Sequence, residues 1–482
     1  MLNQFILPSI VFPLLERSSS TRFWSLYQEL ETLQAADLQA KTDNQHGKLA
    51  HLLRTAGEST PHWRELFAGL GVAPADIDQH NALPLLQQLP VTNKQTYSNG
   101  FPDRVTAQPN DSSWQYLSSA GTTGRMTVVT DFDKRDYLRA AEHLNLKLAI
   151  SRPLGIPTAD IPPSACNVVC GFADSGPEPL AKCLWWATRQ GKLFDDSTMS
   201  DIRGRFERQV ILQRQTLAPI DGASWPEMCV QLDEYLDLIV SEKIQLLRAL
   251  PHFLLWLAKR ARQRGLRCPS LRALIPYGGL AGDVMAQQVS EIFEAPFINV
   301  YGTGEVGAIG CASESSDTID IYQSMVLMES LDDEGRPVPE GEVGNVVITD
   351  LNNLAMPIIR YAIGDIGRLN VSGVQQRLHL LGRKQESFTN NAGELVHARA
   401  LQNLFFSYPA VLNFKLEQVT SQTFKASVVI DPDAGDEDFD QDGLAQALQD
   451  MLASKQKPAI KRTAFIQPET SGKYLSLKPR AS

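Results

Sequence analysis

The feature that most constrains the fold is an alternation of helical and strand-like segments between residues 133 and 300. The helical segments include RDYLRAAEHLNLKLAI and VQLDEYLDLIVSEKIQLLRAL. Between them lie short apolar runs, which are CNVVCG, LRALIPYGG and PFINVYG. This rhythm is typical of a layered α/β structure in which helices cover a sheet. We therefore predict a mixed sheet with helices on its faces.

The pattern of apolar and polar residues differs on either side of this region. Residues 1–110 are predicted to be helical, because HGKLAHLLRTAG and HWRELFAGLG space their apolar residues by three and four before a glycine. A length of 482 residues is also too great for one ordinary core. We predict a large N-terminal α/β domain over residues 1–381 and a small, mobile α+β domain over residues 382–482, hinged near Gly382.

Composition argues against two classes of partner. The 45 basic and 55 acidic residues give a net charge of −10 without any Lys/Arg-rich run, so the basic surface expected of a nucleic-acid binder is missing. Residues 5–15, FILPSIVFPLL, are apolar but contain two prolines and are too short to span a bilayer. We expect this segment to dock on its own protein, with contact to a membrane surface as the alternative.

Six cysteines in so long a chain do not indicate a disulfide framework, so a reducing cytoplasm is expected. Four of them raise a zinc hypothesis: Cys166, Cys170, Cys183 and Cys311. Because no paired C-x2-C spacing is present and free cysteines are common in cores, we favour the core interpretation.

The stretch NVYGTGEVG at residues 299–307 contains the spacing G-x-G-x-x-G in Gly302, Gly304 and Gly307. A dinucleotide-binding turn needs a strand before these glycines and a helix after them, because the pyrophosphate is held at the helix N-terminus. The following residues, AIGCASESSDTIDIYQS, lack an apolar stripe at helical spacing. We therefore disfavour NAD as the ligand.

A second glycine-rich stretch lies within residues 116–131, predicted to be a loop of small and hydroxyl residues followed by a strand. Such runs are usually turns, and the spacing of a P-loop is absent. Glycine nevertheless lets the backbone approach an anion, hydroxyls donate to phosphate oxygens and arginine adds a positive fork. The residues able to hold a polyphosphate in this way are Ser118, Ser119, Gly121, Thr122, Thr123, Gly124 and Arg125.

Two later stretches, IIRYAIGDIG at 358–367 and LLGRKQESFTNNAGELV at 380–396, follow that loop in a recognisable order. Together the three motifs resemble the AMP-forming, adenylate-producing superfamily, and within it the phenylacetate–CoA ligase-like branch. The segments HWRELFAGLGVAPADI and LPVTNKQTY are similar to that branch as well. The resemblance extends over roughly residues 45–475, and the joint occurrence of the motifs is far more specific than any one of them.

The resemblance implies an ATP- and Mg²⁺-dependent ligase that converts a carboxylic acid into an acyl-adenylate and passes the acyl group to CoA. It also assigns roles to residues of this chain. Tyr301 would stack on adenine, Glu305 would bind Mg²⁺, Asp365 would accept the ribose hydroxyls, Arg383 would contact ribose or phosphate, and Lys473 would act at the α-phosphate and carboxylate.

Lys478 is the rival for the role of Lys473. By the same resemblance Gly279, Gly302 and Thr303 belong to the nucleotide site, whereas the segments ALPHFLLWLAK and IPYGGLAG line the pocket for an apolar acid. A homodimer is a further expectation.

Some positions depart from the family pattern, and each departure alters a phosphate contact or the hinge: Ala120, Arg125, Met126, Gly304, Ala362 and Gln385. TNNAGELVHA also differs from the segment that shapes the family's thiol tunnel. Adenylation is therefore better supported than transfer to CoA. The alternatives are acyl transfer to an amine, a hydroxyl or a carrier protein, and a degenerate relative that binds nucleotide without turnover.

Overall fold

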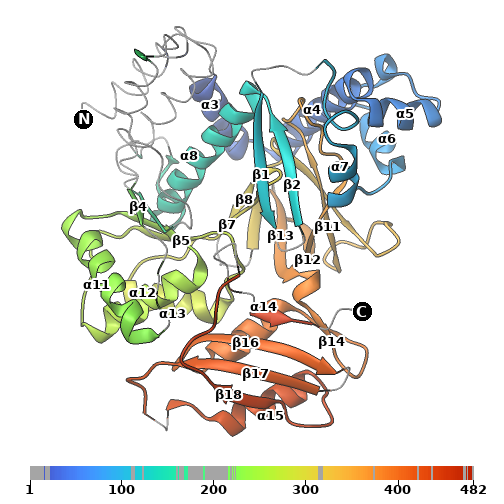
Figure 1. The fold of residues 1–482 in the computed structure, drawn as a ribbon. Helices are drawn as coiled ribbons and strands as arrows, with labels where there is room; N and C mark the ends of the chain where they lie inside the picture. The colour runs from blue at the N-terminus through green and yellow to red at the C-terminus, as the bar shows by residue number, and fades with distance from the viewer. Residues whose placement is uncertain are drawn as a thin grey trace.

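The computed structural model confirms the predicted mixed α/β fold, and Figure 1 shows its parts. Helices and an antiparallel sheet lie at the top, a parallel sheet with its helices at the lower left, and a C-terminal sheet at the bottom. The structure describes residues 13, 16, 22–109, 114–121, 124–158, 161, 168–171, 188–189, 215–217, 220, 222, 224–312, 318–372, 375–420, 423–435, 438–469, 474 and 476–479. Among these residues, no helix is both long and apolar enough to cross a membrane.

Helices dominate the start of the described chain, as predicted. They are α3 (Phe23–Ala35), α4 (Leu38–Ser59), α5 (Pro61–Gly69), the 3₁₀ helix η2 (Pro74–Asp76), α6 (Ala82–Gln88) and α7 (Lys94–Gly100). Asp37 caps α4 by accepting the Ala40 N–H, and Asn93 forms a capping box with Thr96 at α7. Trp63 and other large apolar side chains of these helices are fully buried, so packing holds the helices in place.

A hairpin and a long helix follow. Strands β1 (Gln115–Gly121) and β2 (Gly124–Thr130) pair antiparallel with Gly121 opposite Gly124, and α8 (Phe132–Leu154) begins directly after them. The expected loop before the strand is therefore wrong for residues 116–121, which are themselves a strand. Alternation of polar and apolar residues is weak in QYLSSAG, so the sequence pattern gave no sign of this pairing.

The region from residue 168 to residue 297 forms a parallel sheet in the order β4-β3-β5-β6. Its strands are β3 (Val168–Gly171), β4 (Gln215–Leu217), β5 (Leu246–Ala249) and β6 (Ala273–Pro276), and its helices are α11 (Trp225–Ser241), α12 (Pro251–Gln263) and α13 (Asp283–Phe293). The predicted mixed sheet is not found, because all described strand pairs here are parallel. The apolar strands β3 (VVCG) and β6 (ALIP) suit a parallel sheet that is covered on both faces.

The segment PFINVY connects this sheet to the antiparallel one. Phe297 forms a parallel bridge with Leu274 of β6, and the chain then enters β7 of the larger sheet. That seven-stranded sheet has the order β10-β11-β12-β13-β9-β8-β7. Its strands are β7 (Val300–Thr303), β8 (Gly307–Ala312), β9 (Thr318–Ile321), β10 (Val326–Leu331), β11 (Val343–Asp350), β12 (Tyr361–Ser372) and β13 (Gln375–Arg383).

Gly382 is the penultimate residue of β13, and its φ of +119° favours glycine. A Cβ there would lie 2.8 Å from the Cβ of Ala398, so a side chain would prevent the close approach of the next helix. The C-terminal elements are η6 (Lys384–Glu386), β14 (Phe388–Thr389), β15 (Leu395–Val396), α14 (Ala398–Phe406), β16 (Val411–Thr420), β17 (Thr423–Ile430), α15 (Gln441–Met451), β18 (Ala459–Arg462) and β19 (Leu477–Lys478).

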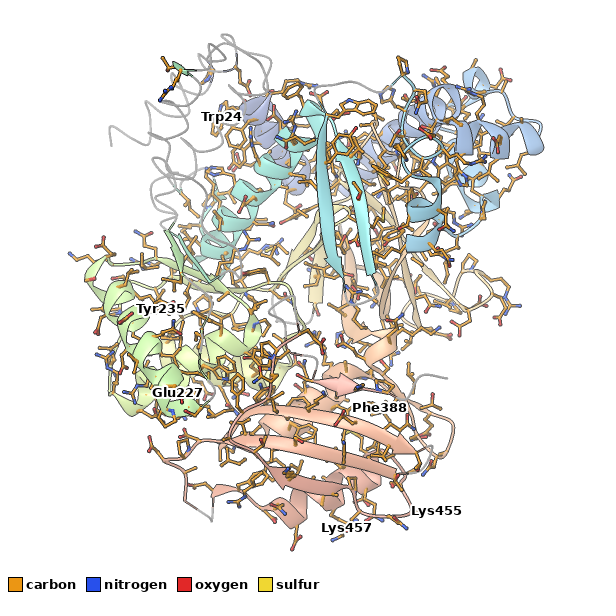
Figure 2. All side chains as sticks on the ribbon, viewed as in Figure 1. Trp24, Glu227, Tyr235, Phe388, Lys455 and Lys457 are labelled. Atoms are coloured by element: carbon orange, nitrogen blue, oxygen red, sulfur yellow. The ribbon has the colours of Figure 1, made fainter. Side chains whose placement is uncertain are left out.

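Two hydrophobic cores organise these parts. One joins the N-terminal helices, α8 and the seven-stranded sheet, whereas the other joins α11, α12 and α13 to the C-terminal elements. Phe388, fully buried just beyond Gly382, belongs to the second core, and Figure 2 shows it near the top of the C-terminal sheet. Lys455 and Lys457 lie at the opposite, outer end of that sheet. The parallel sheet therefore lies between the two cores.

Candidate active site

The G-x-G-x-x-G stretch is a β-hairpin. Thr303 of β7 lies opposite Gly307 of β8, and the Thr303 hydroxyl accepts the Val306 N–H at 3.2 Å. Two of its glycines are required by close packing: a Cβ at Gly302 would overlap the Gly307 carbonyl oxygen, and Gly307 itself has a φ of +91°. Because a strand and not a helix follows the glycines, the geometry of a dinucleotide-binding turn is absent from this hairpin.

Tyr301 and Arg383 converge on the Asp365 carboxylate. The Tyr301 hydroxyl donates to Asp365 Oδ2 at 2.6 Å, and Arg383 Nε lies 3.0 Å from Asp365 Oδ1. Asp365 on β12 is directly opposite Arg383 on β13, whereas Tyr301 comes from β7 at the end of the sheet order. Contact between β7 and β12 across the intervening strands requires the sheet to curl. The structure thus brings together three residues predicted for the nucleotide site.

Burial and charge define the protonation of this cluster. The Tyr301 side chain is buried, and this burial together with the neighbouring Asp365 charge raises the pKa of its phenol well above its ordinary value. The phenol therefore stays protonated and acts as a donor to the carboxylate. The Arg383 side chain remains 40% exposed, against 8% for Asp365, so this arginine faces the space beside the sheet and can reach a ligand there.

Glu305 lies in the turn between β7 and β8, and its carboxylate is 3.6 Å from the ammonium of Lys94. Lys94 is the first residue of α7, and the strand-like Thr92 next to it pairs with Tyr361. Both side chains of the ion pair are mostly buried, at 16% and 13% exposure. Although the segment LPVTNKQTY resembles the family, its lysine has no role predictable from the sequence, because nothing local in that segment reveals a partner some two hundred residues away.

The donor set at Glu305 suits a magnesium ion that arrives with a nucleotide. Among the described residues, no group of three or more His, Cys, Asp or Glu side chains forms a dedicated metal cage. Mg²⁺ held together with substrate phosphates needs only one or two carboxylates from the protein. Glu305 supplies such a carboxylate, and the long distance to Lys94 leaves its oxygens accessible to a stronger cation.

The predicted phosphate-binding stretch forms the tip of the β1–β2 hairpin. Gly121 of β1 pairs with Gly124 of β2. Thr122 and Thr123 lie outside the described residues, and Ser119 and Arg125 are described by their backbone alone. Glycine has no side chain, so these two positions allow a ligand to approach the backbone closely.

Gly279 lies in the exposed loop after β6. A Cβ at this position would lie 3.5 Å from Pro251 Cδ, so the loop IPYGGLAG and the start of α12 are neighbours. These are the two segments predicted to line the acid pocket. They follow the carboxyl ends of β6 and β5, where ligands bind in parallel α/β sheets.

The C-terminal tail packs on the same end of α12. The Tyr474 ring lies 5.4 Å from His252 and 5.2 Å from Trp256, and the Ser476 hydroxyl is 3.5 Å from His252 Nε2. Lys473 lies outside the described residues. Its rival Lys478 is on β19, 58% exposed and 4.0 Å from Glu417.

The cysteines of the zinc hypothesis are only partly described. Cys311 is fully buried in β8, and burial raises the pKa of its thiol. Cys166 and Cys183 lie outside the described residues, and Cys170 is described by its backbone in β3.

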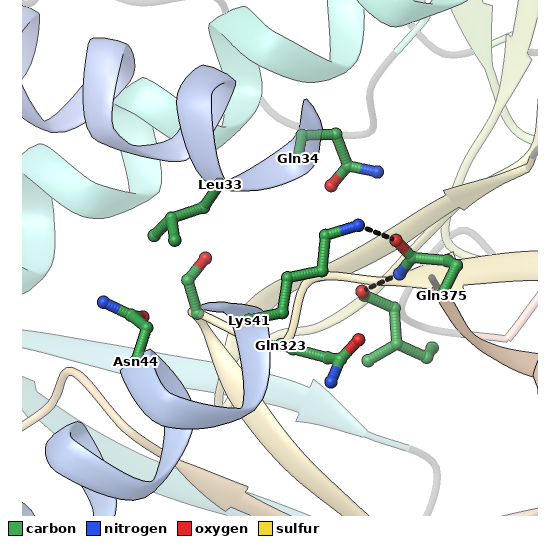
Figure 3. Close-up of a pocket in the computed structure, with 8 residues that line it drawn as sticks. Leu33, Gln34, Lys41, Asn44, Gln323 and Gln375 are labelled. Carbon is green, nitrogen blue, oxygen red and sulfur yellow. Dashed lines mark hydrogen bonds between the residues drawn. The ribbon is translucent and has the colours of Figure 1, made fainter. Parts of the chain in front are cut away.

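A small pocket between α3, α4 and β13 is separate from this site (Figure 3). The Lys41 ammonium donates to Gln375 Oε1 at 2.9 Å across it, and Gln375 in turn donates to the Ile321 carbonyl. Its cavity volume of about 10 Å³ is at the lower limit for a single water molecule, so the pocket has no room for a small-molecule ligand. Gln375 begins β13 and Arg383 ends it, so the two lie about 26 Å apart at the rise of a strand.

No protein-family model matches the chain. Its sequence is similar to curated phenylacetate–coenzyme A ligases. The ligase of Thermus thermophilus is 26% identical over 353 residues, which are 71% of this chain and 68% of that enzyme. The ligase of Escherichia coli is 26% identical over 354 residues, which are 70% of this chain and 69% of that enzyme.

Solved structures have the same fold. A crystal structure of 2-hydroxyisobutyryl-CoA ligase in the postadenylation state matches with a TM-score of 0.64 at 18% identity, covering 89% of this chain and 87% of that one. The same ligase in the thioesterification state, with an acyl-AMP and CoA bound, matches with a TM-score of 0.53 at 19% identity, covering 89% and 88%.

Proposed function

We propose that this chain, a homologue of phenylacetate–CoA ligases with the fold of an adenylate-forming CoA ligase, is an AMP-forming acid–CoA ligase. It would activate a carboxylic acid with ATP as an acyl-adenylate and then transfer the acyl group to the thiol of CoA. The observation that carries the proposal is the convergence of Tyr301, Asp365 and Arg383, three residues from motifs far apart in the sequence.

The first half-reaction brings a carboxylate oxygen of the acid to the α-phosphorus of ATP. A bond forms between them, and the bond to the bridging oxygen breaks, so pyrophosphate leaves. Because both reactants are anions, the site must supply positive charge where negative charge accumulates. Arg383 and Lys94 are described cations at this site, and we assign Lys473 to the α-phosphate and the carboxylate. Bound Mg²⁺ would add charge against the phosphates, with Glu305 as its ligand.

Asp365 and Tyr301 would hold the nucleoside. Asp365, in the first half of β12, presents a carboxylate that can accept the two ribose hydroxyls once Arg383 turns toward the phosphates. Tyr301 would present its ring to the adenine, with its hydroxyl fixed on Asp365. Gly121 and Gly124 would let the hairpin tip lie against the β- and γ-phosphates, together with Ser119, Thr122, Thr123 and Arg125.

The second half-reaction is attack of the CoA thiolate on the acyl carbon, with AMP leaving. We propose that residues 382–482 rotate about Gly382 between the two steps and that residues 1–381 remain in place. Support comes from the left-handed φ at Gly382 and from its tight packing on Ala398, which together suit a defined bend. We place the enzyme in the cytoplasm, since the described cysteines Cys229, Cys268 and Cys311 are free thiols.

Product analysis tests the acceptor. The enzyme is supplied with ATP, Mg²⁺, a panel of apolar acids and either CoA, hydroxylamine or a carrier protein, and the products are identified by mass spectrometry. We expect an acyl-CoA thioester formed in equal amount with AMP. AMP release that depends on an amine or a carrier protein and leaves CoA unused would assign the acceptor to the other class.

A further inference from the structure

The start of α8 holds the turn that carries Glu305. The Lys134 side chain is 1% exposed, and its ammonium donates at 2.8 Å to the Val306 carbonyl and at 2.8 Å to Asp350 Oδ1. The partner Asp350 is the last residue of β11 and is fully buried. A buried cation thus links three elements: α8, β11 and the β7–β8 turn.

The same face of α8 supports the turn a second time. Leu138 follows Lys134 by one helical turn and packs so closely on Gly307 that a Cβ there would overlap Leu138 Cδ2. On the other side, the Thr303 hydroxyl accepts the Val306 N–H. The two peptide units that follow Glu305 are therefore both fixed, one through the Val306 N–H and one through its carbonyl.

A buried ion pair is weak evidence for stability, because the cost of desolvating two charges offsets their attraction. The Lys134–Asp350 pair calls for another explanation, and its hydrogen bond to Val306 gives one. Residues that orient a metal ligand without touching the metal commonly change metal affinity when they are replaced. Lys134 does not touch the proposed metal site, but its hydrogen bond to the Val306 carbonyl can orient Glu305.

We propose that Lys134 and Asp350 are positioning residues that hold the Glu305 carboxylate in place for the Mg²⁺ of the nucleotide complex. They act through the Val306 carbonyl. The inference rests on the proposed function, which makes Glu305 the metal ligand. It goes beyond that function because it assigns the positioning of Glu305 to a buried ion pair whose residues come from α8 and β11.

The test removes both charges together, since replacing one partner alone would strand a buried charge and could unfold the protein. The variant is Lys134→Met/Asp350→Leu. Mn²⁺, which prefers the same oxygen ligands as Mg²⁺, is titrated into the ATP complex and free Mn²⁺ is read by electron paramagnetic resonance. Hydrogen exchange of the peptide spanning residues 301–307 is measured in parallel by mass spectrometry.

We expect the apparent Mn²⁺ dissociation constant to rise about tenfold. Exchange at the turn should accelerate, whereas ATP binding in EDTA should stay unchanged. The matched control is Arg260→Met/Asp233→Leu, which removes an ion pair between α11 and α12 and should leave both readouts unchanged. The variant Lys134→Gln/Asp350→Asn keeps a donor for the Val306 carbonyl and should retain the Mn²⁺ affinity of the parent.

Unchanged Mn²⁺ affinity in the Met/Leu variant would overturn the proposal. So would weakened affinity with unchanged exchange at the turn, because the effect would then be one of charge and not of position. If the parent protein with ATP takes up no Mn²⁺, the metal role of Glu305 in the proposed function is wrong and the positioning proposal falls with it. Failure confined to the Met/Leu variant leaves the proposed function intact.

Discussion

The Asp365 carboxylate is only 8% exposed and lies beside a tyrosine hydroxyl and an arginine. A carboxylate in such surroundings has a fixed direction as an acceptor, because Tyr301 holds one of its oxygens and Arg383 the other. When a ribose arrives, only Arg383 has to turn away, whereas the Tyr301 hydroxyl keeps its hold on the other carboxylate oxygen. At the scale of residues, we therefore predict that nucleotide binding depends on Asp365 more than on any other described position.

Replacing Asp365 by alanine should weaken ATP binding. The ribose loses a charged acceptor, and such hydrogen bonds contribute about 1.5–3 kcal/mol. Calorimetry should therefore show an ATP dissociation constant raised by about tenfold or more. The control is Asp320→Ala, since Asp320 is similarly buried and pairs with Arg152 and Arg377 but lies outside the proposed site. Equal ATP affinity in the Asp365 variant and the parent would remove Asp365 from the nucleotide site.

Some residues of the candidate site could be predicted from the sequence, and others could not. Tyr301, Asp365 and Arg383 could be predicted because each belongs to a local motif, and the structure brings them together. Lys94 and Lys134 could not be predicted. Their partners Glu305 and Asp350 are more than two hundred residues away in the chain, and a lone lysine in a helical segment is more often an exposed one.

At the scale of elements, the sequence predicted where strands occur better than it predicted how they pair. The alternation of helical segments and short apolar runs correctly indicated an α/β region, because apolar runs such as those at β5 and β6 are strands of a few residues. It did not separate the parallel sheet from the antiparallel one, because both kinds of strand are short and apolar when buried on two faces. Strands β1 and β2 pair up to Gly121 and Gly124. This pairing was not predicted, because the hydroxyl-rich β1 has the composition of a loop.

The contact between α12 and the C-terminal tail should make the protein sensitive to acid. Burial of His252 lowers the pKa of its ring from 6.5 to about 4. Between these values the unfolded chain binds a proton that the folded protein does not, so the free energy of unfolding falls as the pH falls from 6.5 to 4. The contribution of this one ring is at most about 3 kcal/mol.

The variant His252→Phe should keep the aromatic packing with Tyr474 and Trp256 but lose part of this acid sensitivity. Urea unfolding at pH 7 and pH 4.5 measures the difference. His143, whose pKa is lowered to about 3 by burial, remains in the variant, so some dependence on pH should persist. His51→Gln, at an exposed position of α4, is the control. An unchanged loss of stability between the two pH values would show that His252 does not titrate as its burial requires.

At the scale of the whole molecule, the C-terminal part is fastened to α12 and α13 by specific hydrogen bonds as well as by the second core. The Trp256 indole donates to the Leu412 carbonyl at 3.0 Å, Lys259 donates to the Pro409 carbonyl at 2.7 Å, and Arg399 pairs with Asp283 at 2.8 Å. Rotation about Gly382 has to break these contacts and replace them with others. The arrangement described is thus one defined state of a molecule that we propose has two.

We propose that Lys473 is the residue that distinguishes the two states. In the adenylating arrangement its ammonium should meet the carboxylate and the α-phosphate, and after rotation it should lie far from them. Lys473→Ala should therefore slow adenylation by about a hundredfold or more. Thioester formation from a supplied acyl-adenylate and CoA should be spared. Lys478→Ala should retain most activity in both steps, because that side chain is exposed and lies beside Glu417. The opposite behaviour of the two variants would assign the role to Lys478.

We propose that this chain makes an acyl-adenylate, and isotope exchange between pyrophosphate and ATP tests this first step before any acceptor is known. The exchange needs the adenylate to form and to revert, so it reports the first half-reaction alone. We predict exchange that requires both Mg²⁺ and one of a panel of apolar carboxylic acids, and that is lost in the Asp365→Ala variant. Absence of exchange with every acid, in a protein that nevertheless binds ATP, would contradict the claim and identify the chain as a nucleotide-binding protein without this activity.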